Sequence, residues 1–303
     1  MRSRRDVLRS GLGAAAALAL SQSRAASELP LITKAIPATG ERLPVVGLGT
    51  DQFREGERAA IQAEIQRMLE LGGTVIDTAA AYGDSEEVIG GALAELGSRD
   101  KAFVATKLTV NEGGTDTRSG EDSFHRSLER LRTRRVDLLQ VHNLEGVEAL
   151  MPVLQKWKKE GKIRYLGITT SRVGQHGHMT QFMREYPLDF VQVDYSLANR
   201  DAAANVLPLA LERRIAVLAN IPFGYGSVLR QAQQRRLPDW AADIDVTSWS
   251  QFLLKYVMAH PAVTCVIPGS TKVAHLEENQ RAGRGRLPDE AMRRRMEQAW
   301  DAS

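Results

Sequence analysis

The chain of 303 residues contains a single cysteine, Cys265. One thiol cannot form an intramolecular disulfide, and it cannot supply the several thiolates of a metal cluster. Low-complexity tracts are also missing, and 43% hydrophobic with 25% charged residues is the composition of a globular protein. A disulfide scaffold and a thiolate metal centre are therefore excluded, and the length suits one large domain or two ordinary ones.

Long hydrophobic runs are missing as well. The apolar stretch near the N-terminus, Gly11–Leu20, has ten residues and is too short to span a bilayer. A basic segment precedes this stretch, and small residues follow it. This layout predicts a secretory signal peptide, residues 1–26, with cleavage near Ala25 or Ala26.

The export route is suggested by Arg4 and Arg5. In the sequence S-R-R-D-V-L they resemble the twin-arginine motif, whose pathway carries folded proteins. No cysteine follows the apolar stretch, so we expect no lipid or other membrane anchor in the mature domain, residues 27–303. We expect the export machinery as a partner and a periplasmic location, with a basic N-terminus of no export function as the alternative.

An excess of positive charge is also absent from the mature domain. Residues 1–26 hold five arginines against Asp6, a net charge of +4, whereas the whole chain has +3, so residues 27–303 carry about −1. The basic isoelectric point therefore comes from the export segment. It gives no support for binding to nucleic acid.

After residue 30, short apolar runs alternate with longer amphipathic stretches. The runs that predict strands are 45–50, 74–78, 102–107, 136–142, 164–170, 190–195, 215–220 and 264–269. Helical patterns between them include 58–72, 121–133 and 148–161. Eight strand–helix units predict a (β/α)8 TIM barrel, preceded by a β-hairpin with its turn at Thr39-Gly40.

An open doubly wound sheet is the competing architecture. Such a sheet would carry a glycine-rich dinucleotide fingerprint after its first strand. The loose match at residues 11–16 has no strand before it and no acidic residue at the right distance after it. It belongs to the export segment, and the barrel is the preferred prediction.

Four ionisable residues follow three consecutive predicted strands. Asp77 ends the second strand and Tyr82 lies in its loop, Lys107 ends the third strand, and His142 ends the fourth. The C-terminal strand ends of a barrel gather at one face, so we expect these side chains to lie together. Each one alone has an ordinary structural explanation, but the set together indicates a catalytic site.

The chemistry that suits this set is proton donation. A free tyrosine has a pKa of about 10, and a neighbouring Lys107 ammonium would lower the pKa of Tyr82. Asp77 would keep the lysine charged, and His142 would orient a substrate carbonyl. The carbonyl carbon then receives a nucleophile, and with no activated serine or cysteine, hydride is the natural candidate.

These residues resemble the catalytic tetrad of the aldo-keto reductase family. The resemblance covers most of residues 31–282 and extends to several further motifs. They are D-T-A-x-x-Y-G-x-S-E at 77–86, G-I-T-T at 167–170, Q-V-D-Y-S at 192–196, I-P-G-S-T-K at 267–272 and H-L-E-E-N at 275–279. The family implies an NADP(H) cofactor, with NAD(H) possible, and Tyr82 as the general acid of carbonyl reduction to an alcohol.

The resemblance also implies the cofactor-binding residues. They are Thr169, Thr170, Gln192, Pro222, Phe223, Gly224, Gly269, Ser270, Thr271, Lys272, Glu278 and Asn279. Among these, Gln192 and Thr169 would hold the nicotinamide amide, residues 269–271 the phosphate, and residues 278–279 the adenine. Asn220 stands where many members stack an aromatic ring on the nicotinamide, and Lys272 is the candidate for the 2′-phosphate.

One alternative to this reading stays open. The barrel could be an exported protein that holds nucleotide as a binding or sensor protein with little turnover. His176 and His178 could suggest a metal, but two histidines in an expected loop are too few, and we predict no metal site. Small-molecule carbonyl substrates would be recognised by loops 111–120 and 222–247 and by the tail after residue 283.

Overall fold

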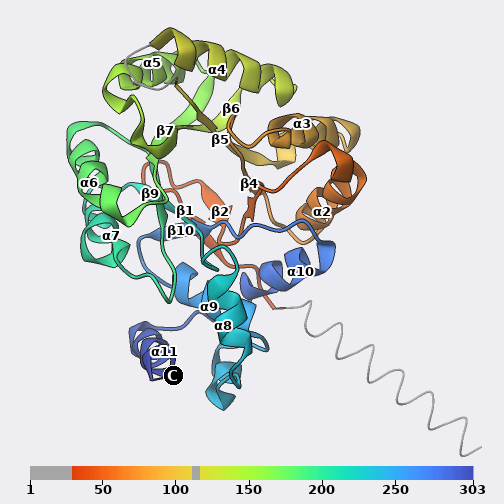
Figure 1. Ribbon diagram of the computed structural model, residues 1–303, viewed down its shortest axis with the longest axis vertical. Helices are drawn as coiled ribbons and strands as arrows, with labels where there is room; N and C mark the ends of the chain where they lie inside the picture. The colour runs from red at the N-terminus through yellow and green to blue at the C-terminus, as the bar shows by residue number, and fades with distance from the viewer. Residues whose placement is uncertain (1–28, 111–116, 303) are drawn as a thin grey trace, which may run out of the picture. The chain divides into compact units, whose positions relative to one another are not determined.

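Eight parallel strands form a ring at the centre of the computed structural model (Figure 1). They are β3 (Leu48–Gly49), β4 (Val75–Asp77), β5 (Phe103–Leu108), β6 (Val136–Val141), β7 (Ile163–Thr169), β8 (Phe190–Asp194), β9 (Ala216–Asn220) and β10 (Val263–Val266). Each strand pairs with its neighbours in chain order. Bridges Val46–Val266 and Gly49–Gly269 join the first strand to the last and close the ring. The predicted (β/α)8 barrel is confirmed.

The structure describes residues 29–110 and 117–302. The chain from Ile32 onward forms one compact unit. The predicted signal peptide and its cleavage site lie outside the described residues, so they stay predictions. None of the helices in the described part combines the length and the apolar character that a membrane crossing requires.

Helices surround the strands on the outside (Figure 1). They are α2 (Arg58–Glu70), α3 (Ser85–Glu95), α4 (Thr117–Arg130), α5 (Val147–Lys159), α6 (His176–Glu185), α7 (Ala202–Glu212), α8 (Ser227–Gln233), α9 (Trp249–Met258), α10 (Val273–Ala282) and α11 (Glu290–Asp301). Short 3-10 helices are η1 (Glu55–Glu57), η2 (Arg99–Lys101), η3 (His142–Leu144), η4 (Val173–Gln175) and η5 (Asp239–Ile244). The three helices predicted by residue range correspond to α2, α4 and α5.

A β-hairpin closes the N-terminal end of the barrel. Strands β1 (Thr33–Ala35) and β2 (Arg42–Pro44) are antiparallel, and Gly40 in their turn has a φ of +79°, as the predicted turn requires. Ile36 and Leu43 of this hairpin are buried in one cluster with side chains from the strand beginnings. The hairpin therefore plugs the end of the barrel opposite to the expected active site.

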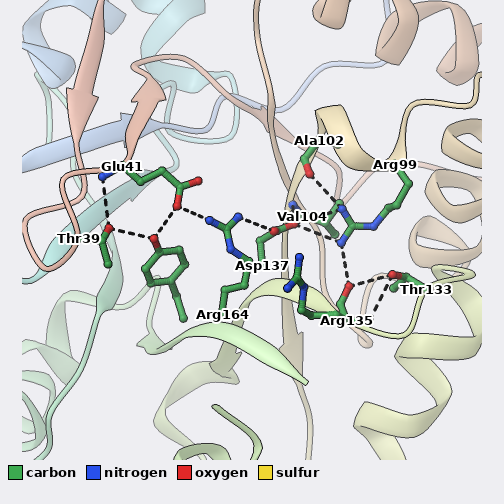
Figure 2. Close-up of polar contacts among 10 residues, drawn as sticks. Thr39, Glu41, Arg99, Ala102, Val104, Thr133, Arg135, Asp137 and Arg164 are labelled. Carbon is green, nitrogen blue, oxygen red and sulfur yellow. Dashed lines mark hydrogen bonds and ion pairs between the residues drawn. The ribbon is translucent and has the colours of Figure 1, made fainter. Parts of the chain in front are cut away.

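Polar contacts fix the hairpin to the barrel, as Figure 2 shows. Glu41 forms an ion pair with Arg164 and accepts a hydrogen bond of 2.6 Å from the Tyr165 hydroxyl. Arg164 also pairs with Asp137 at 2.8 Å, and Asp137 in turn pairs with Arg99 at 3.2 Å. One chain of charges thus connects the hairpin with β7, β6 and η2.

The alternation of side chains along each strand determines what faces the interior of the barrel. On β5, Phe103 and Ala105 belong to the interior cluster, whereas Val104 packs with the helices outside. Lys107 lies two residues beyond Ala105 and so faces the same interior, one layer higher. The lysine is therefore held inside the barrel by the strand itself.

Gly90 gives a test of how closely the outer helices pack. A Cβ at this position of α3 would lie 2.1 Å from the Arg130 carbonyl oxygen and 2.7 Å from the Leu131 Cα, both backbone atoms. Gly90→Ala should therefore lower the free energy of unfolding by about 1–3 kcal/mol or more. Urea unfolding followed by circular dichroism measures this.

Gly177 of α6 is the matched control, because a Cβ there meets no atom within 4 Å. Gly177→Ala should leave stability unchanged or raise it by up to about 1 kcal/mol. Equal stability of both variants would contradict the close contact between α3 and the end of α4.

Candidate active site

The C-terminal ends of the strands surround a cavity of about 1040 Å³. Residues that line it at the strand ends are Asp77, Tyr82, His142, Thr169, Gln192 and Asn220. Residues that line it toward α10 are Gly269, Ser270, Thr271, His275, Glu278 and Asn279. The barrel thus brings the predicted catalytic and phosphate-binding segments to one cavity.

A buried ion pair lies at the floor of this cavity. Lys107 Nζ is 2.6 Å from Asp77 Oδ2 and donates a second hydrogen bond of 2.8 Å to the Thr78 carbonyl. Burial is the largest single influence and lowers the pKa of Lys107, but the charge and hydrogen bond of Asp77 together with neighbouring Tyr82 outweigh burial and raise that pKa above its ordinary value. The lysine is therefore an ammonium at neutral pH, as the sequence predicts.

Tyr82 lies beside this ammonium, with Lys107 Nζ 4.8 Å from the centre of the phenol ring. Burial raises the pKa of Tyr82 above 10, and the charge of Lys107 opposes this rise without cancelling it. The prediction of a lowered pKa was wrong in its net direction because the extent of burial dominates. The phenol consequently keeps its proton at neutral pH and can donate it.

His142 packs edge-on against Tyr82, with ring centres 5.8 Å apart and an interplanar angle of 79°. Burial first, then the positive charges of Lys107 and Arg172, lower the pKa of His142 to about 3. The imidazole is therefore neutral at any ordinary pH. A neutral imidazole beside a protonated phenol presents two hydrogen-bond donors to one acceptor oxygen.

Gln192 has a role that the sequence did not indicate. Its Nε2 donates a hydrogen bond of 2.7 Å to Asp77 Oδ1, so both oxygens of Asp77 are engaged. Its Oε1 accepts hydrogen bonds from Thr169 Oγ1 at 3.1 Å and from Asn220 Nδ2 at 3.4 Å. Gln192 therefore extends the ion pair to β7 and β9 in addition to lining the cavity.

Not every predicted cofactor residue lines the cavity. Pro222 and Phe223 do, together with the residues already named, whereas Thr170, Gly224 and Lys272 do not. The Thr170 hydroxyl donates to the Gln175 side chain. Lys272 precedes α10, and its N–H donates to Ser270 Oγ at 3.2 Å. These three support or flank the site instead of forming its wall.

Arg172 is a lining residue that the sequence did not reveal. It lies between β7 and α6, outside the loops predicted to recognise substrate, and no motif contains it. A basic residue three positions after a strand end was the available signal. Its charge acts on His142, as the lowered pKa of that histidine shows.

The histidine pair has a structural explanation. His176 Nε2 lies 2.9 Å from Asp194 Oδ1, and both residues are buried. His176 begins α6, so the expectation of a loop was wrong, because Met179 and Met183 bury one face of a helix there. Within the described ranges no group of three or more histidine, cysteine or acidic side chains is placed to hold a metal.

The buried pair can be tested through stability. Asp77→Asn leaves the Lys107 ammonium without its counterion and should lower the free energy of unfolding by about 3–5 kcal/mol. The double variant Asp77→Asn/Lys107→Met removes the buried charge and should recover part of this loss. Urea unfolding of the three proteins measures both steps, and a double variant no more stable than Asp77→Asn would contradict the assignment.

Comparisons with known proteins agree with this geometry. The family model described as "Aldo/keto reductase family" matches residues 45–300. Aldo-keto reductase YhdN of Bacillus subtilis is 33% identical over 213 residues, which is 64% of this chain and 61% of that relative. Methylglyoxal reductase YeaE of Escherichia coli is 30% identical over 245 residues, 78% of this chain and 84% of that relative.

Solved structures give the same result. An aldo/keto reductase from Klebsiella pneumoniae in complex with NADP and acetate has a TM-score of 0.71 at 26% identity, covering 86% of this chain and 93% of that one. An aldo-keto reductase from the same organism in complex with NADPH has a TM-score of 0.73 at 25% identity, covering 89% and 96%. The chain, with its tetrad assembled at the mouth of a closed barrel, belongs to the aldo/keto reductase family.

Proposed function

We propose that this oxidoreductase reduces an aldehyde or ketone to an alcohol with NADP(H), and that Tyr82 is the general acid. The observation that carries the proposal is the protonation pattern of the tetrad. A charged Lys107, a protonated Tyr82 and a neutral His142 meet at the floor of one cavity. A protonated phenol can give its proton to a carbonyl oxygen, and the neighbouring ammonium favours the phenolate that is left.

Each side chain has a separate task in the reaction. Tyr82 and His142 donate hydrogen bonds to the carbonyl oxygen and hold the carbonyl carbon toward the cofactor side. When bound, the reduced nicotinamide supplies the hydride that this carbon accepts. Tyr82 gives its proton to the oxygen, and the ammonium of Lys107 stabilises the phenolate that remains. Asp77 keeps Lys107 charged and in position.

The described residues fit a dinucleotide. The cavity extends from the tetrad to the N-terminus of α10, where Ser270 and Thr271 line it and the first turn offers free N–H groups to a phosphate. Asn220 Oδ1 is buried without a hydrogen-bond partner among the described residues. It is an acceptor in the region where Thr169 and Gln192 would meet the nicotinamide amide.

Glu278 supports an adenine site at the other end. It accepts a hydrogen bond of 3.0 Å from Gln251 and another from Ser248, so its carboxylate is fixed before any ligand arrives. Asn279 is buried beside it and lines the same cavity. The Klebsiella relatives, solved with NADP and with NADPH, favour the phosphorylated cofactor for this chain.

Export to the periplasm stays part of the proposal. The twin-arginine-like segment at residues 1–26 supports it, and transport in the folded state would allow the barrel to carry its cofactor.

Tyr82→Phe tests the assignment of the acid. Removing the hydroxyl should lower kcat for reduction of 4-nitrobenzaldehyde or methylglyoxal by about 10²–10⁴-fold. NADPH binding, followed by protein fluorescence, should be unchanged, because the ring and its contact with His142 remain. Absorbance loss at 340 nm measures the turnover.

The wild type and Tyr82→Phe together separate a reductase from a protein that only holds nucleotide. Equal turnover in both would exclude Tyr82 as the acid. Tight NADPH binding with no turnover of a broad aldehyde panel in either protein would favour a protein that holds nucleotide.

Recognition of the 2′-phosphate of NADP(H) is tested by Lys272→Ala and His275→Ala. His275 lines the cavity whereas Lys272 does not, although both lie near the start of α10. If either residue binds the 2′-phosphate, its removal should raise KM for NADPH about tenfold and leave KM for NADH nearly unchanged. An equal rise for both cofactors would assign the residue to packing around α10.

A further inference from the structure

We propose that Arg172 binds an anionic group of the substrate, so that the enzyme prefers carbonyl compounds that also carry a carboxylate. The inference rests on the proposed function, since it names the substrate class of the same site. It is carried by the position of Arg172 in the ring of strands, by the charges around the cavity, and by the contacts that hold its backbone.

The position of Arg172 separates it from the phosphate end of the cavity. With β3 as the first strand of the ring, β6 is the fourth and β7 is the fifth. His142 follows β6, and Arg172 follows β7. Ser270 follows β10 and Asp51 follows β3, the last and first strands, which lie on the opposite side of a closed eight-stranded ring. Arg172 therefore lines the side of the cavity next to His142, which with Tyr82 would bind the carbonyl oxygen.

The described residues around the cavity provide no ion-pair partner for Arg172. Among the described residues that line the cavity, it is the one lysine or arginine. No ion pair of the described part of the chain includes it. The acidic lining residues are Asp51, Glu57, Asp77 and Glu278.

None of these four acidic residues forms an ion pair with Arg172 on its side of the cavity. Asp77 is paired with Lys107, and Glu278 is held at α10 by Gln251 and Arg281. Asp51 and Glu57 follow β3 on the opposite side of the ring. Arg172 is an exposed residue at the mouth of the cavity, and its guanidinium is close enough to His142 to lower the pKa of that histidine, so it is a site for an anion that enters the cavity.

Hydrogen bonds fix the backbone at Arg172 relative to the turn that contains His142 and Asn143. Its N–H donates to Thr170 Oγ1 at 3.1 Å, and its carbonyl accepts from Gln175 N at 2.9 Å. The Gln175 side chain accepts from the Thr170 hydroxyl and donates to the Asn143 carbonyl at 3.2 Å. Asn143 directly follows His142, so the same set of hydrogen bonds positions the backbone of Arg172 and of His142.

This geometry defines the substrate class. The carbonyl oxygen binds Tyr82 and His142, and a carboxylate elsewhere on the same molecule reaches toward the β7 side of the mouth. Oxo acids and aldehyde acids fit this description, because a planar carboxylate can take two parallel hydrogen bonds from a guanidinium. A neutral aldehyde would use the tetrad alone.

The experiment compares two aldehydes that differ in one charge, 4-formylbenzoate and its methyl ester. In the wild type, kcat/KM should be higher for the acid. In Arg172→Gln, the ratio of acid to ester should fall about tenfold or more, while kcat/KM for the ester stays within about twofold. Arg172→Lys should restore part of the ratio, and added salt should reduce it in the wild type.

Arg236→Gln is the matched control. Its side chain is 85% exposed, it pairs with Asp239, and it does not line the cavity. This variant should keep the wild-type ratio, which shows that the loss of a positive charge elsewhere on the protein is not enough. The 2- and 3-formylbenzoates then report which separation of carbonyl and carboxylate fits best.

The outcomes separate this inference from the proposed function. An unchanged ratio in Arg172→Gln, or an equal loss for acid and ester, overturns the carboxylate site and leaves the reductase intact. If the wild type reduces neither aldehyde, calorimetry with the NADPH-loaded protein decides. Weaker binding of 4-formylbenzoate to Arg172→Gln then supports the anion site although the proposed turnover has failed, and equal binding overturns it.

Discussion

The ion pair between Asp77 and Lys107 is the interaction on which the rest of the site depends. Two opposite charges are withdrawn from water, and such a pair is tolerated only where every remaining hydrogen-bonding position is filled. The Thr78 carbonyl accepts a second hydrogen bond from Lys107, and the Gln192 amide donates to the second oxygen of Asp77. The pair thereby joins β4 and β5 and reaches β8 across the interior. The ammonium also acts on the two neighbouring side chains. It opposes the rise that burial causes in the pKa of Tyr82, and it adds to burial in lowering the pKa of His142.

The barrel below the pair makes that arrangement possible. Side chains from β4 to β10, with Ile36 and Leu43 of the hairpin, fill the interior beneath Lys107. The charged network around Glu41 and Arg164 then locks the hairpin in place at the far end (Figure 2). Apolar packing thus fills the N-terminal end of the barrel interior, whereas the ionisable residues gather at the C-terminal end. This division is general for such barrels and lets the loops change without loss of the fold.

The sequence was sufficient for the order of the strands and for the meeting of Asp77, Lys107 and His142 at one end of the barrel, since an ionisable residue that ends an apolar run is a local pattern. Contacts between distant segments were not predictable in this way. Gln192 and Asp77 are 115 residues apart, and only the closed ring shows that they bond. The net pKa shift of Tyr82 also required knowledge of its burial. Arg172 was missed for the same reason, because its place beside His142 is visible only once β6 and β7 lie next to each other at the cavity.

The neutrality of His142 connects recognition with chemistry. An anion bound at Arg172 would offset one of the two positive charges that lower the pKa of the histidine. Burial is the largest cause of that shift, and Lys107 is a second cause independent of any substrate. The imidazole therefore stays neutral, and remains a hydrogen-bond donor, whether or not the anion is present. A guanidinium on this wall can select a charged substrate without altering the protonation states that the reduction needs, which makes Arg172 a position where specificity can change while the tetrad is preserved.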